Sequence, residues 1–238
     1  MDILWRILNP FQLFILAIWS AVCATSGILL VPLLLSRKRA IYVCSRIMWS
    51  PVVMIVSGVL IKVSGRENAP RDRACIYIAN HESQFDIAAL VRSVPVPLFF
   101  IAKQELRKVP FLGWYMRAVG MIFVDRGNKE NALLSMKRAA KIIREGRNVI
   151  SFPEGTRSKT GDMLLFKKGS FIIAREGGID IVPIGISGAR EVLPSGSFKL
   201  RPGIIRVQIG KPISVKDHRH LSDEQMAEFA RTEVGRLR

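Results

Sequence analysis

Two residues near the start of the second third of this chain, His81 and Asp86, are suited to act as an acid–base pair. Both lie within residues 80–86, which read Asn-His-Glu-Ser-Gln-Phe-Asp. A carboxylate beside an imidazole selects the tautomer of the ring and raises its basicity, as a general base requires. Residues five apart on a continuous helix face directions about 140° apart. The two side chains therefore meet only if His81 lies in a turn and Asp86 in the first turn of a helix, where the helix dipole favours a carboxylate. From these residues alone, the alternative is a packed histidine and a capping aspartate.

A second candidate site lies at residues 153–157, which read Pro-Glu-Gly-Thr-Arg. A turn that contains Gly155 and Thr156 offers backbone N–H groups, and the planar guanidinium of Arg157 matches a phosphate. Glu154 is placed to orient that guanidinium. The alternative is an ordinary surface turn with a Glu–Arg pair.

Two further cations, Lys103 and Arg126, each follow a predicted strand. If the strands are parallel, both cations lie at the edge of the sheet that also carries His81 and Arg157. One histidine, one aspartate and several cations at one edge indicate attack on a carbonyl near a phosphate. Lys103 is suited either to bind that phosphate or to stabilise the oxyanion of a tetrahedral intermediate. Each cation alone is more often a solvated surface charge.

Other catalytic chemistries find no support in the sequence. No serine lies in a Gly-x-Ser-x-Gly elbow. The three cysteines, Cys23, Cys44 and Cys75, lie in apolar runs, which predicts buried thiols in a reducing compartment. The remaining histidines, His218 and His220, lie in a charged loop and offer too few ligands for zinc. We therefore expect neither a covalent nucleophile nor a metal.

The elements that must position these residues alternate between strands and helices. Apolar, β-branched runs predict strands at residues 74–79, 97–102, 121–124, 148–152, 179–186 and 204–209. Helical patterns cover residues 87–92, 129–145 (with Asn128 as N-cap) and 169–176, and a last helix starts at Ser222, which forms a capping box with Gln225. This alternation predicts an α/β domain with a mixed, largely parallel sheet flanked by helices.

The N-terminal part is apolar enough to bind a membrane. Residues 11–35 carry no charge and would form a helix of about 37 Å, enough for a hydrocarbon core of about 30 Å. A second apolar run covers residues 40–63, but Arg46 and Lys62 leave only a short uncharged stretch, which favours a helix lying in the interface.

The topology follows from the basic residues 37–39 and the basic main domain. The positive-inside rule places both in the cytoplasm, so at most the first helix crosses. We predict a two-helix anchor at residues 1–63, monotopic or single-pass, and a catalytic domain at residues 64–238 on the cytoplasmic side of the inner membrane. A cleaved signal peptide fits less well, because the apolar run is too long and only Arg6 precedes it as a base.

The charge of the chain is uneven. The formal net charge is +17, and residues 64–215 contain 25 basic and 13 acidic side chains, whereas residues 216–238 contain five of each. A basic middle indicates an anionic partner, such as phospholipid, nucleic acid or a phosphorylated substrate.

Four blocks of the sequence together resemble the glycerolipid acyltransferases, most closely the bacterial 1-acyl-sn-glycerol-3-phosphate (lysophosphatidic acid) acyltransferases. The blocks are the Asn-His-x4-Asp motif at 80–86, residues 103–126 with Pro110 and Gly113, residues 152–157 with 166–169, and residues 181–184. Leu165 departs from the pattern, since many relatives have proline there.

The resemblance implies a glycerol-3-phosphate acyltransferase-like fold and acyl transfer to the sn-2 hydroxyl of lysophosphatidate, giving phosphatidate. Acyl-CoA or acyl carrier protein would serve as co-substrate, with no other cofactor. His81 would be the general base, oriented by Asp86. The residues that would bind the substrate are Lys103, Arg126, Glu154, Gly155, Thr156 and Arg157.

Three alternatives stay open. Glycerol-3-phosphate or another lysolipid could be the acceptor, because the motifs describe phosphate and hydroxyl chemistry and say less about the tail. The chain could also be a non-catalytic membrane protein that binds anionic lipid, although an intact His–Asp pair argues against this. Nucleic-acid binding would explain the charge but not the apolar N-terminus.

Overall fold

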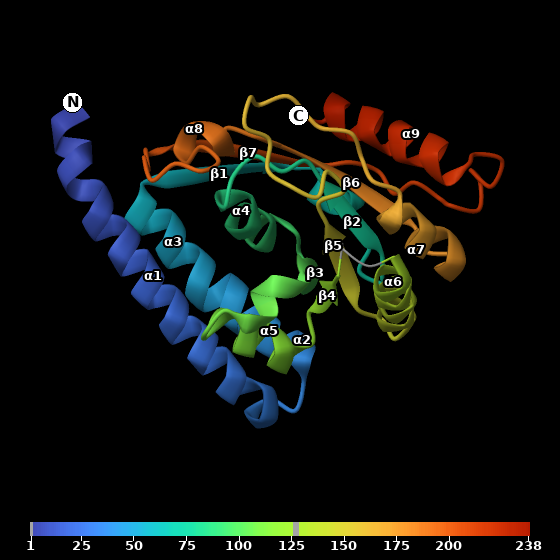
Figure 1. Ribbon diagram of the computed structural model, residues 1–238, viewed down its shortest axis with the longest axis horizontal. Helices are drawn as coiled ribbons and strands as arrows, with labels where there is room; N and C mark the ends of the chain where they lie inside the picture. The colour runs from blue at the N-terminus through green and yellow to red at the C-terminus, as the bar shows by residue number, and fades with distance from the viewer. Residues whose placement is uncertain (1, 126–128) are drawn as a thin grey trace.

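The structure is a computed structural model that describes residues 2–125 and 129–238 (Figure 1). Side chains are described for residues 7–125 and 134–238. Two predicted roles, Arg126 as a substrate contact and Asn128 as a helix cap, lie outside the described residues.

Seven strands form one sheet in the order β1-β7-β6-β2-β5-β3-β4. Neighbouring strands are parallel except β6 and β7, which are antiparallel. The strands are β1 (Val59–Ser64), β2 (Ile76–Ala79), β3 (Leu98–Lys103), β4 (Ile122–Val124), β5 (Asn148–Ser151), β6 (Ile181–Ser187) and β7 (Gly203–Ile209). The predicted mixed, largely parallel α/β sheet is confirmed.

Along the chain, the helices precede the first strand, lie between the strands and, in the case of α9, follow the last strand. Four consecutive segments form the N-terminal part: α1 (Asp2–Leu33), α2 (Arg37–Ile41), the π-helix η1 (Tyr42–Trp49) and α3 (Ser50–Ser57). The others are η2 (Arg66–Asn68), α4 (Phe85–Ser93), η3 (Gln104–Lys108), α5 (Leu112–Val119), α6 (Lys129–Arg144), α7 (Gly169–Gly177), α8 (Ala189–Val192) and α9 (Asp223–Arg236). Ser222 and Gln225 form the predicted capping box of α9.

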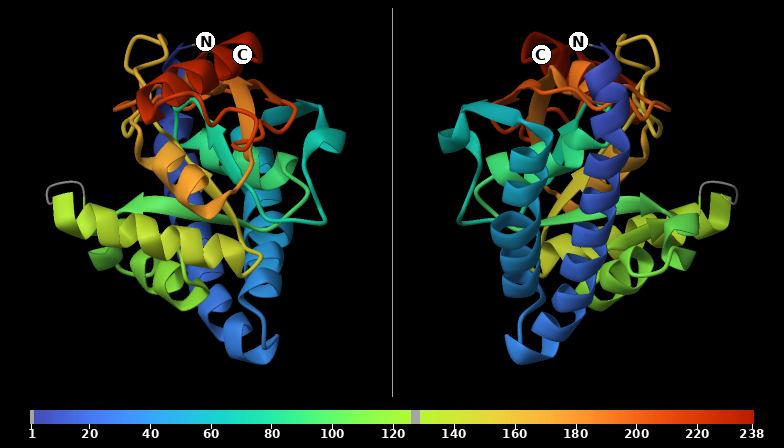
Figure 2. Two further views of the ribbon diagram at one scale, coloured as in Figure 1. Left: turned by 90° about the vertical axis from the view of Figure 1, so that its right-hand side faces the viewer. Right: turned by 90° about the vertical axis from the view of Figure 1, so that its left-hand side faces the viewer.

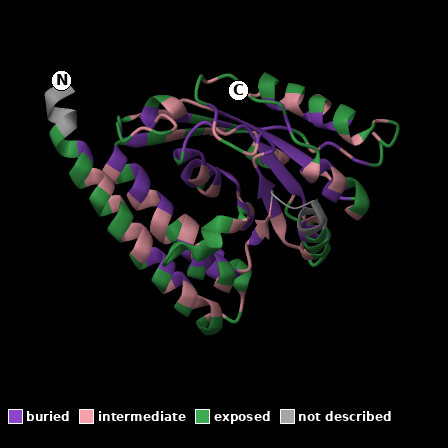
Figure 3. Cartoon of the chain, viewed as in Figure 1, coloured by how far each residue is buried: buried purple, intermediate pink, exposed green. Residues whose placement is uncertain are grey.

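Helices cover both faces of the sheet, and the centre is buried (Figure 3). Side chains of a strand alternate between faces. On β2, Ile76 and Ile78 join the core cluster that includes residues of α6, α7 and α9, whereas Tyr77 and Ala79 join the cluster that includes residues of α4 and α8. A parallel strand buried on both faces is expected to be apolar throughout. For this reason the apolar run at residues 74–79 could be predicted as a strand from the sequence.

The N-terminal helix α1 and the helical stretch from α2 to α3 lie side by side and protrude at one end beyond the sheet (Figure 2). Residues 7–33 and 37–57 are long and apolar enough to cross a membrane by length and composition. One side of α1 exposes large apolar residues to solvent: Phe11, Phe14, Ile18, Leu29 and Leu33. These two helices indicate membrane association.

Polar contacts tie both helices to the sheet domain. The Nδ2 of Asn9 in α1 donates to the carbonyl of Leu200 at 2.9 Å, and the Leu200 N–H donates to Asn9 Oδ1 at 2.8 Å. The guanidinium of Arg46 in η1 donates to the carbonyls of Val91 at 3.0 Å and Val94 at 2.5 Å. It thereby satisfies carbonyls that the end of α4 leaves without helical partners.

The second apolar run is not helical throughout, contrary to expectation. The helix ends at Ser57, because Gly58 adopts a left-handed conformation (φ 65°) that caps it. Residues Val59–Ser64 then pair with β7 as an edge strand. The predicted division into an anchor (1–63) and a catalytic domain (64–238) therefore has its boundary inside β1, and that division stays a prediction.

Candidate active site

Three parallel strands deliver polar residues to one edge of the sheet. Strand β2 leads into His81, its neighbour β5 leads into residues 153–157, and β3 ends at Lys103. The carboxyl ends of parallel strands lie at the same edge, where α/β proteins bind ligands. The structure thus places His81, Arg157 and Lys103 on the edge predicted for them.

His81 and Asp86 are in direct contact. The Nδ1 of His81 lies 2.8 Å from Oδ2 of Asp86, which is the second residue of α4 and fully buried. The side chain of His81 is 15% exposed. The predicted arrangement, with the histidine in the turn and the aspartate in the first helical turn, is confirmed.

The carboxylate of Asp86 is held by the loop that it orients. Its Oδ2 also accepts the backbone N–H of Glu82 at 2.7 Å and of Ser83 at 2.9 Å. Because an ionised carboxylate only accepts hydrogen bonds, Nδ1 of His81 is the donor in this pair. The other ring nitrogen, Nε2, then keeps its lone pair for a proton.

An aromatic ring packs against the face of His81. Phe152 stacks on the imidazole with ring centroids 3.9 Å apart and an interplanar angle of 13°. Phe152 follows β5, so the strand adjacent to β2 fixes the plane of the imidazole. The sequence offered one signal for this contact, an apolar residue between the strand and the Pro-Glu-Gly-Thr-Arg turn.

Glu154 connects the two candidate sites through the backbone. One oxygen accepts the N–H of His81 at 2.7 Å, and the other accepts the N–H of Leu164 at 2.8 Å. Burial raises the pKa of the Glu154 carboxyl, and these N–H donors act in the opposite direction. The carboxylate therefore bonds the backbone of residues 80–86, the histidine loop, and the backbone of its own loop. The sequence had predicted instead that Glu154 orients the guanidinium of Arg157.

The remainder of the turn is more open. Gly155 has a left-handed backbone (φ 75°), and its N–H donates within the turn to Phe152 O at 3.0 Å. Thr156 is exposed and Arg157 is half-buried. Within residues 7–125 and 134–238, no side chain hydrogen-bonds or ion-pairs with the guanidinium of Arg157. Its donors are thus available to an anionic ligand.

Lys103 is the most exposed of the described candidate residues that carry a charge. Its Nζ lies 2.9 Å from Glu105 Oε1, and the two side chains are 58% and 65% exposed. Such a surface pair is worth little to stability and is easily exchanged for another anion.

The histidine loop is also hydrogen-bonded to β6 and to the segment that follows α8. Asn80 donates from Nδ2 to the carbonyl of Ile186 at 2.9 Å and accepts the Ile186 N–H at 2.8 Å, which ties the loop to β6. Ser83 donates from its hydroxyl to the carbonyl of Leu193 at 2.7 Å. Both residues belong to the motif at 80–86, but the sequence predicted no role for either in holding this loop.

Comparison with known proteins identifies the family. Residues 60–187 match the family described as Acyltransferase, so the chain belongs to that family and is an enzyme that transfers acyl groups. The resemblance read from the four sequence blocks is thereby confirmed.

Several relatives are named 1-acyl-sn-glycerol-3-phosphate acyltransferase. The Saccharomyces cerevisiae protein is 32% identical over 97% of this chain and 76% of its own length. The Borreliella burgdorferi protein is 36% identical over 54% of this chain and 52% of its own. A chloroplast protein of Arabidopsis thaliana is 37% identical over 64% of this chain, which spans only 43% of that relative.

A solved structure shares the fold. The crystal structure of the 1-acyl-sn-glycerophosphate (LPA) acyltransferase from Thermotoga maritima aligns with a TM-score of 0.84 at 29% identity. The alignment covers 99% of this chain and 95% of that one, and therefore includes both N-terminal helices.

Proposed function

We propose that this enzyme transfers a fatty acyl group from a thioester to the sn-2 hydroxyl of lysophosphatidate, giving phosphatidate. The observation that carries the proposal is the His81–Asp86 pair, 2.8 Å apart, at the sheet edge that also presents Arg157. The names of the relatives support lysophosphatidate as the acceptor.

His81 acts as the general base in this proposal. Its Nε2 takes the hydroxyl proton while the oxygen attacks the thioester carbonyl and a C–O bond forms. The tetrahedral intermediate then collapses, the C–S bond breaks, and the thiolate leaves with the proton returned by the imidazolium. A positioned base of this kind is typically worth about 10²–10⁴ in rate. Asp86 stabilises the imidazolium without taking its proton.

The acceptor's phosphate is bound at the neighbouring strand ends. Arg157 provides the planar fork, and Lys103 and Arg126 are further candidate contacts. Glu154, Gly155 and Thr156 shape the turn that holds Arg157. Lys103 retains the alternative role of oxyanion stabilisation.

The enzyme works at the cytoplasmic face of the inner membrane, on a monotopic anchor. The exposed apolar side of α1, which carries Phe14 and Leu33, is suited to enter the hydrophobic part of the bilayer. Asn9 and Arg46 bond these helices to the sheet domain, which supports an anchor that lies against the domain over one that crosses away from it. The basic surface suits either acyl carrier protein or the phosphates of coenzyme A as donor.

Acceptor and donor are tested in one set of assays. The detergent-purified protein is incubated with a labelled donor, either palmitoyl-CoA or palmitoyl-acyl carrier protein. The acceptor is lysophosphatidate, glycerol-3-phosphate or lysophosphatidylcholine. We expect labelled phosphatidate from lysophosphatidate only. Labelled product from glycerol-3-phosphate or lysophosphatidylcholine, with none from lysophosphatidate, would contradict the assignment of lysophosphatidate as the acceptor.

The base is tested with His81→Ala, and the exposed His220→Ala is the matched control. Folding of both is compared by thermal unfolding. We expect almost no product from the His81 variant and parental turnover from the control. Equal product from both variants would leave the acyltransferase class intact and remove His81 as base. Binding of the His81 variant to anionic vesicles separates lost chemistry from lost membrane association.

A further inference from the structure

The residue after His81, Glu82, is buried and paired with a cation from the far end of the sequence. The Glu82 carboxylate forms an ion pair with the guanidinium of Arg238, and the two side chains are 5% and 29% exposed. We propose that Arg238 is a positioning residue for acyl transfer, which holds the loop of the general base and the loop of Arg157 in register. This inference rests on the proposed function of His81 and Arg157.

Arg238 contacts both loops with one side chain. Besides the carboxylate of Glu82, its guanidinium bonds the carbonyl of Gly161 at 2.5 Å. Gly161 lies four residues after Arg157, in the loop that begins at the end of β5. Arg238 is therefore a direct link between residues 80–86 and the loop of Arg157.

Other guanidinium groups hold the same loop by its backbone. Arg190 of α8 donates to the carbonyl of Lys159 at 3.2 Å. Arg231 of α9 donates to the carbonyls of Leu164 and Met163, both at 3.2 Å. Arg238 differs from both because it also reaches the loop of the base.

Close packing of the backbone brings Arg238 to this place. Helix α9 packs on β6, and after it Leu237 passes directly over Gly185 of that strand. A Cβ at Gly185 would lie 2.3 Å from the carbonyl carbon of Leu237, so only glycine permits this approach. The route of the chain after α9 is thus determined by the sheet itself.

Glu82 depends on Arg238 for its charge. The pKa of the Glu82 carboxyl is raised to about 7, chiefly by burial, and Asp86 of α4 and Glu191 of α8 contribute to this rise. Arg238 lowers it, as does the amide of Asn80, which lies 3.3 Å away. Without Arg238, a buried carboxyl would face two other carboxylates, and its pKa would rise above neutral.

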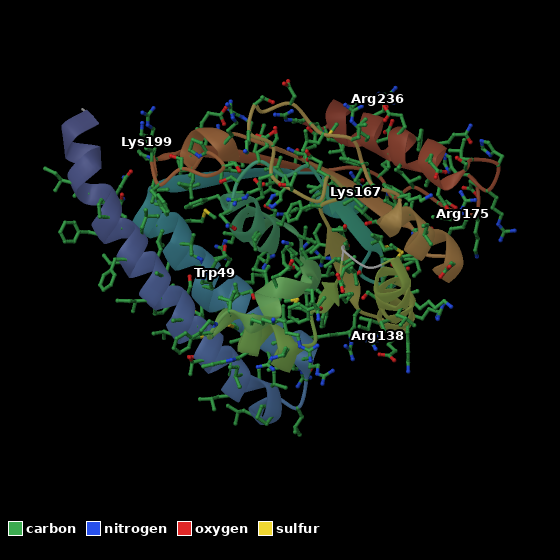
Figure 4. All side chains as sticks on the ribbon, in the orientation of Figure 1. Trp49, Arg138, Lys167, Arg175, Lys199 and Arg236 are labelled. Atoms are coloured by element: carbon green, nitrogen blue, oxygen red, sulfur yellow. The ribbon has the colours of Figure 1, made fainter. Side chains whose placement is uncertain are left out.

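The test compares four variants across pH. Arg238→Gln removes the cation, Arg238→Lys keeps a charge, and the double variant Glu82→Gln/Arg238→Gln removes both charges. Arg236→Gln is the control, since Arg236 lies two residues earlier on the outer side of α9, pairs with Glu233 and is 70% exposed (Figure 4). Turnover of lysophosphatidate is measured from pH 6.5 to 9, together with thermal unfolding.

We expect the Arg238→Gln defect to grow with pH. At pH 6.5 the protonated Glu82 is tolerated, whereas at pH 9 it ionises without a partner and the loop of His81 shifts. We expect kcat to fall about tenfold more at pH 9 than at pH 6.5, with less change in KM, as for a lost charge-assisted contact. Arg238→Lys should recover most of this loss, and the double variant should show the parental pH dependence.

The proposal would be overturned if the ratio of kcat of Arg238→Gln to kcat of the parent stayed constant across pH. It would also be overturned if kcat of the double variant depended on pH as strongly as kcat of Arg238→Gln. Thermal unfolding separates this from failure of the proposed function. A carboxyl whose folded-state pKa is raised loses stabilisation as pH rises through that pKa. The unfolding midpoint of Arg238→Gln should therefore fall further below the parent between pH 6.5 and 9, even if the parent transfers no acyl group to lysophosphatidate.

Discussion

Two polar loops follow the neighbouring strands β2 and β5, and they differ in how many of their side chains are hydrogen-bonded within the protein. In the loop of residues 80–86, His81, Asp86 and Ser83 all bond within the protein. In the loop of residues 153–164, the backbone is held by Glu154, but Thr156 is exposed and Arg157 keeps its donors available.

This difference corresponds to two tasks. A base must point in one direction when the substrate arrives, so its partners are fixed in advance. A residue that binds an incoming phosphate must keep hydrogen-bond donors free, because the ligand is their partner. Changes in the first loop should therefore lower kcat, and changes in the second should raise KM.

The largest effect is expected for Asp86→Asn. An amide at this position can favour the wrong tautomer of His81 and cannot stabilise the imidazolium, so we expect kcat to fall by about 10²–10⁴. KM for lysophosphatidate should change little. Steady-state kinetics and circular dichroism check this, and a loss confined to KM would contradict the division between the two loops.

A smaller loss is expected for Glu154→Gln, which removes one of the contacts between the two loops. The amide NH₂ of glutamine would face one of the backbone N–H groups of His81 and Leu164. We expect destabilisation of about 1–3 kcal/mol, as for an unsatisfied buried donor. Chemical denaturation measures this, with the half-exposed Glu145→Gln as control. Equal stability of both variants would show that Glu154 is not a structural link.

A defect in binding is expected for Arg157→Gln. Loss of a charged contact to phosphate typically costs about 1.5 kcal/mol or more, which is about tenfold in KM for lysophosphatidate. We expect kcat to stay within about threefold, because the base loop is untouched. Lys159→Gln, an exposed neighbour, is the control. A fall in kcat with unchanged KM would place Arg157 at the reacting carbonyl.

The smallest effect is expected for Lys103→Gln. Lys103 is exposed and already paired with Glu105, so its removal should raise KM by about twofold to threefold, within the range of surface charge contacts. A drop in kcat of tenfold or more would assign Lys103 to the oxyanion instead. The same kinetic series therefore resolves the two roles that the sequence left open.

Much of the fold could be predicted because its central strands are buried on both faces. The runs that lead to His81 and Lys103 are apolar, and the run before Pro153 is apolar except for Asn148 and Ser151. Each of the three is a strand of the sheet. Strand β1 could not be separated from the helix before it. Both segments are apolar, and residues 59–64 become a strand by pairing with β7, about 140 residues later in the chain.

The sequence by itself determined the contacts that depend on local geometry. The five-residue spacing of His81 and Asp86 allows the pair only at the start of a helix, and Ser222 and Gln225 lie at the spacing of a capping box. Local dihedral preferences and short spacings suffice for such contacts.

Only the tertiary structure decided the partners of Glu154 and Glu82. Glu154 lies three residues from Arg157 but bonds to His81, and Glu82 pairs with Arg238 at the other end of the chain. The choice depends on which backbone donors and cations the packed sheet brings to a buried carboxylate. Burial makes an unpaired charge costly, so the packing of the chain selects the partner. The partner therefore cannot be predicted from the spacing of residues in the sequence.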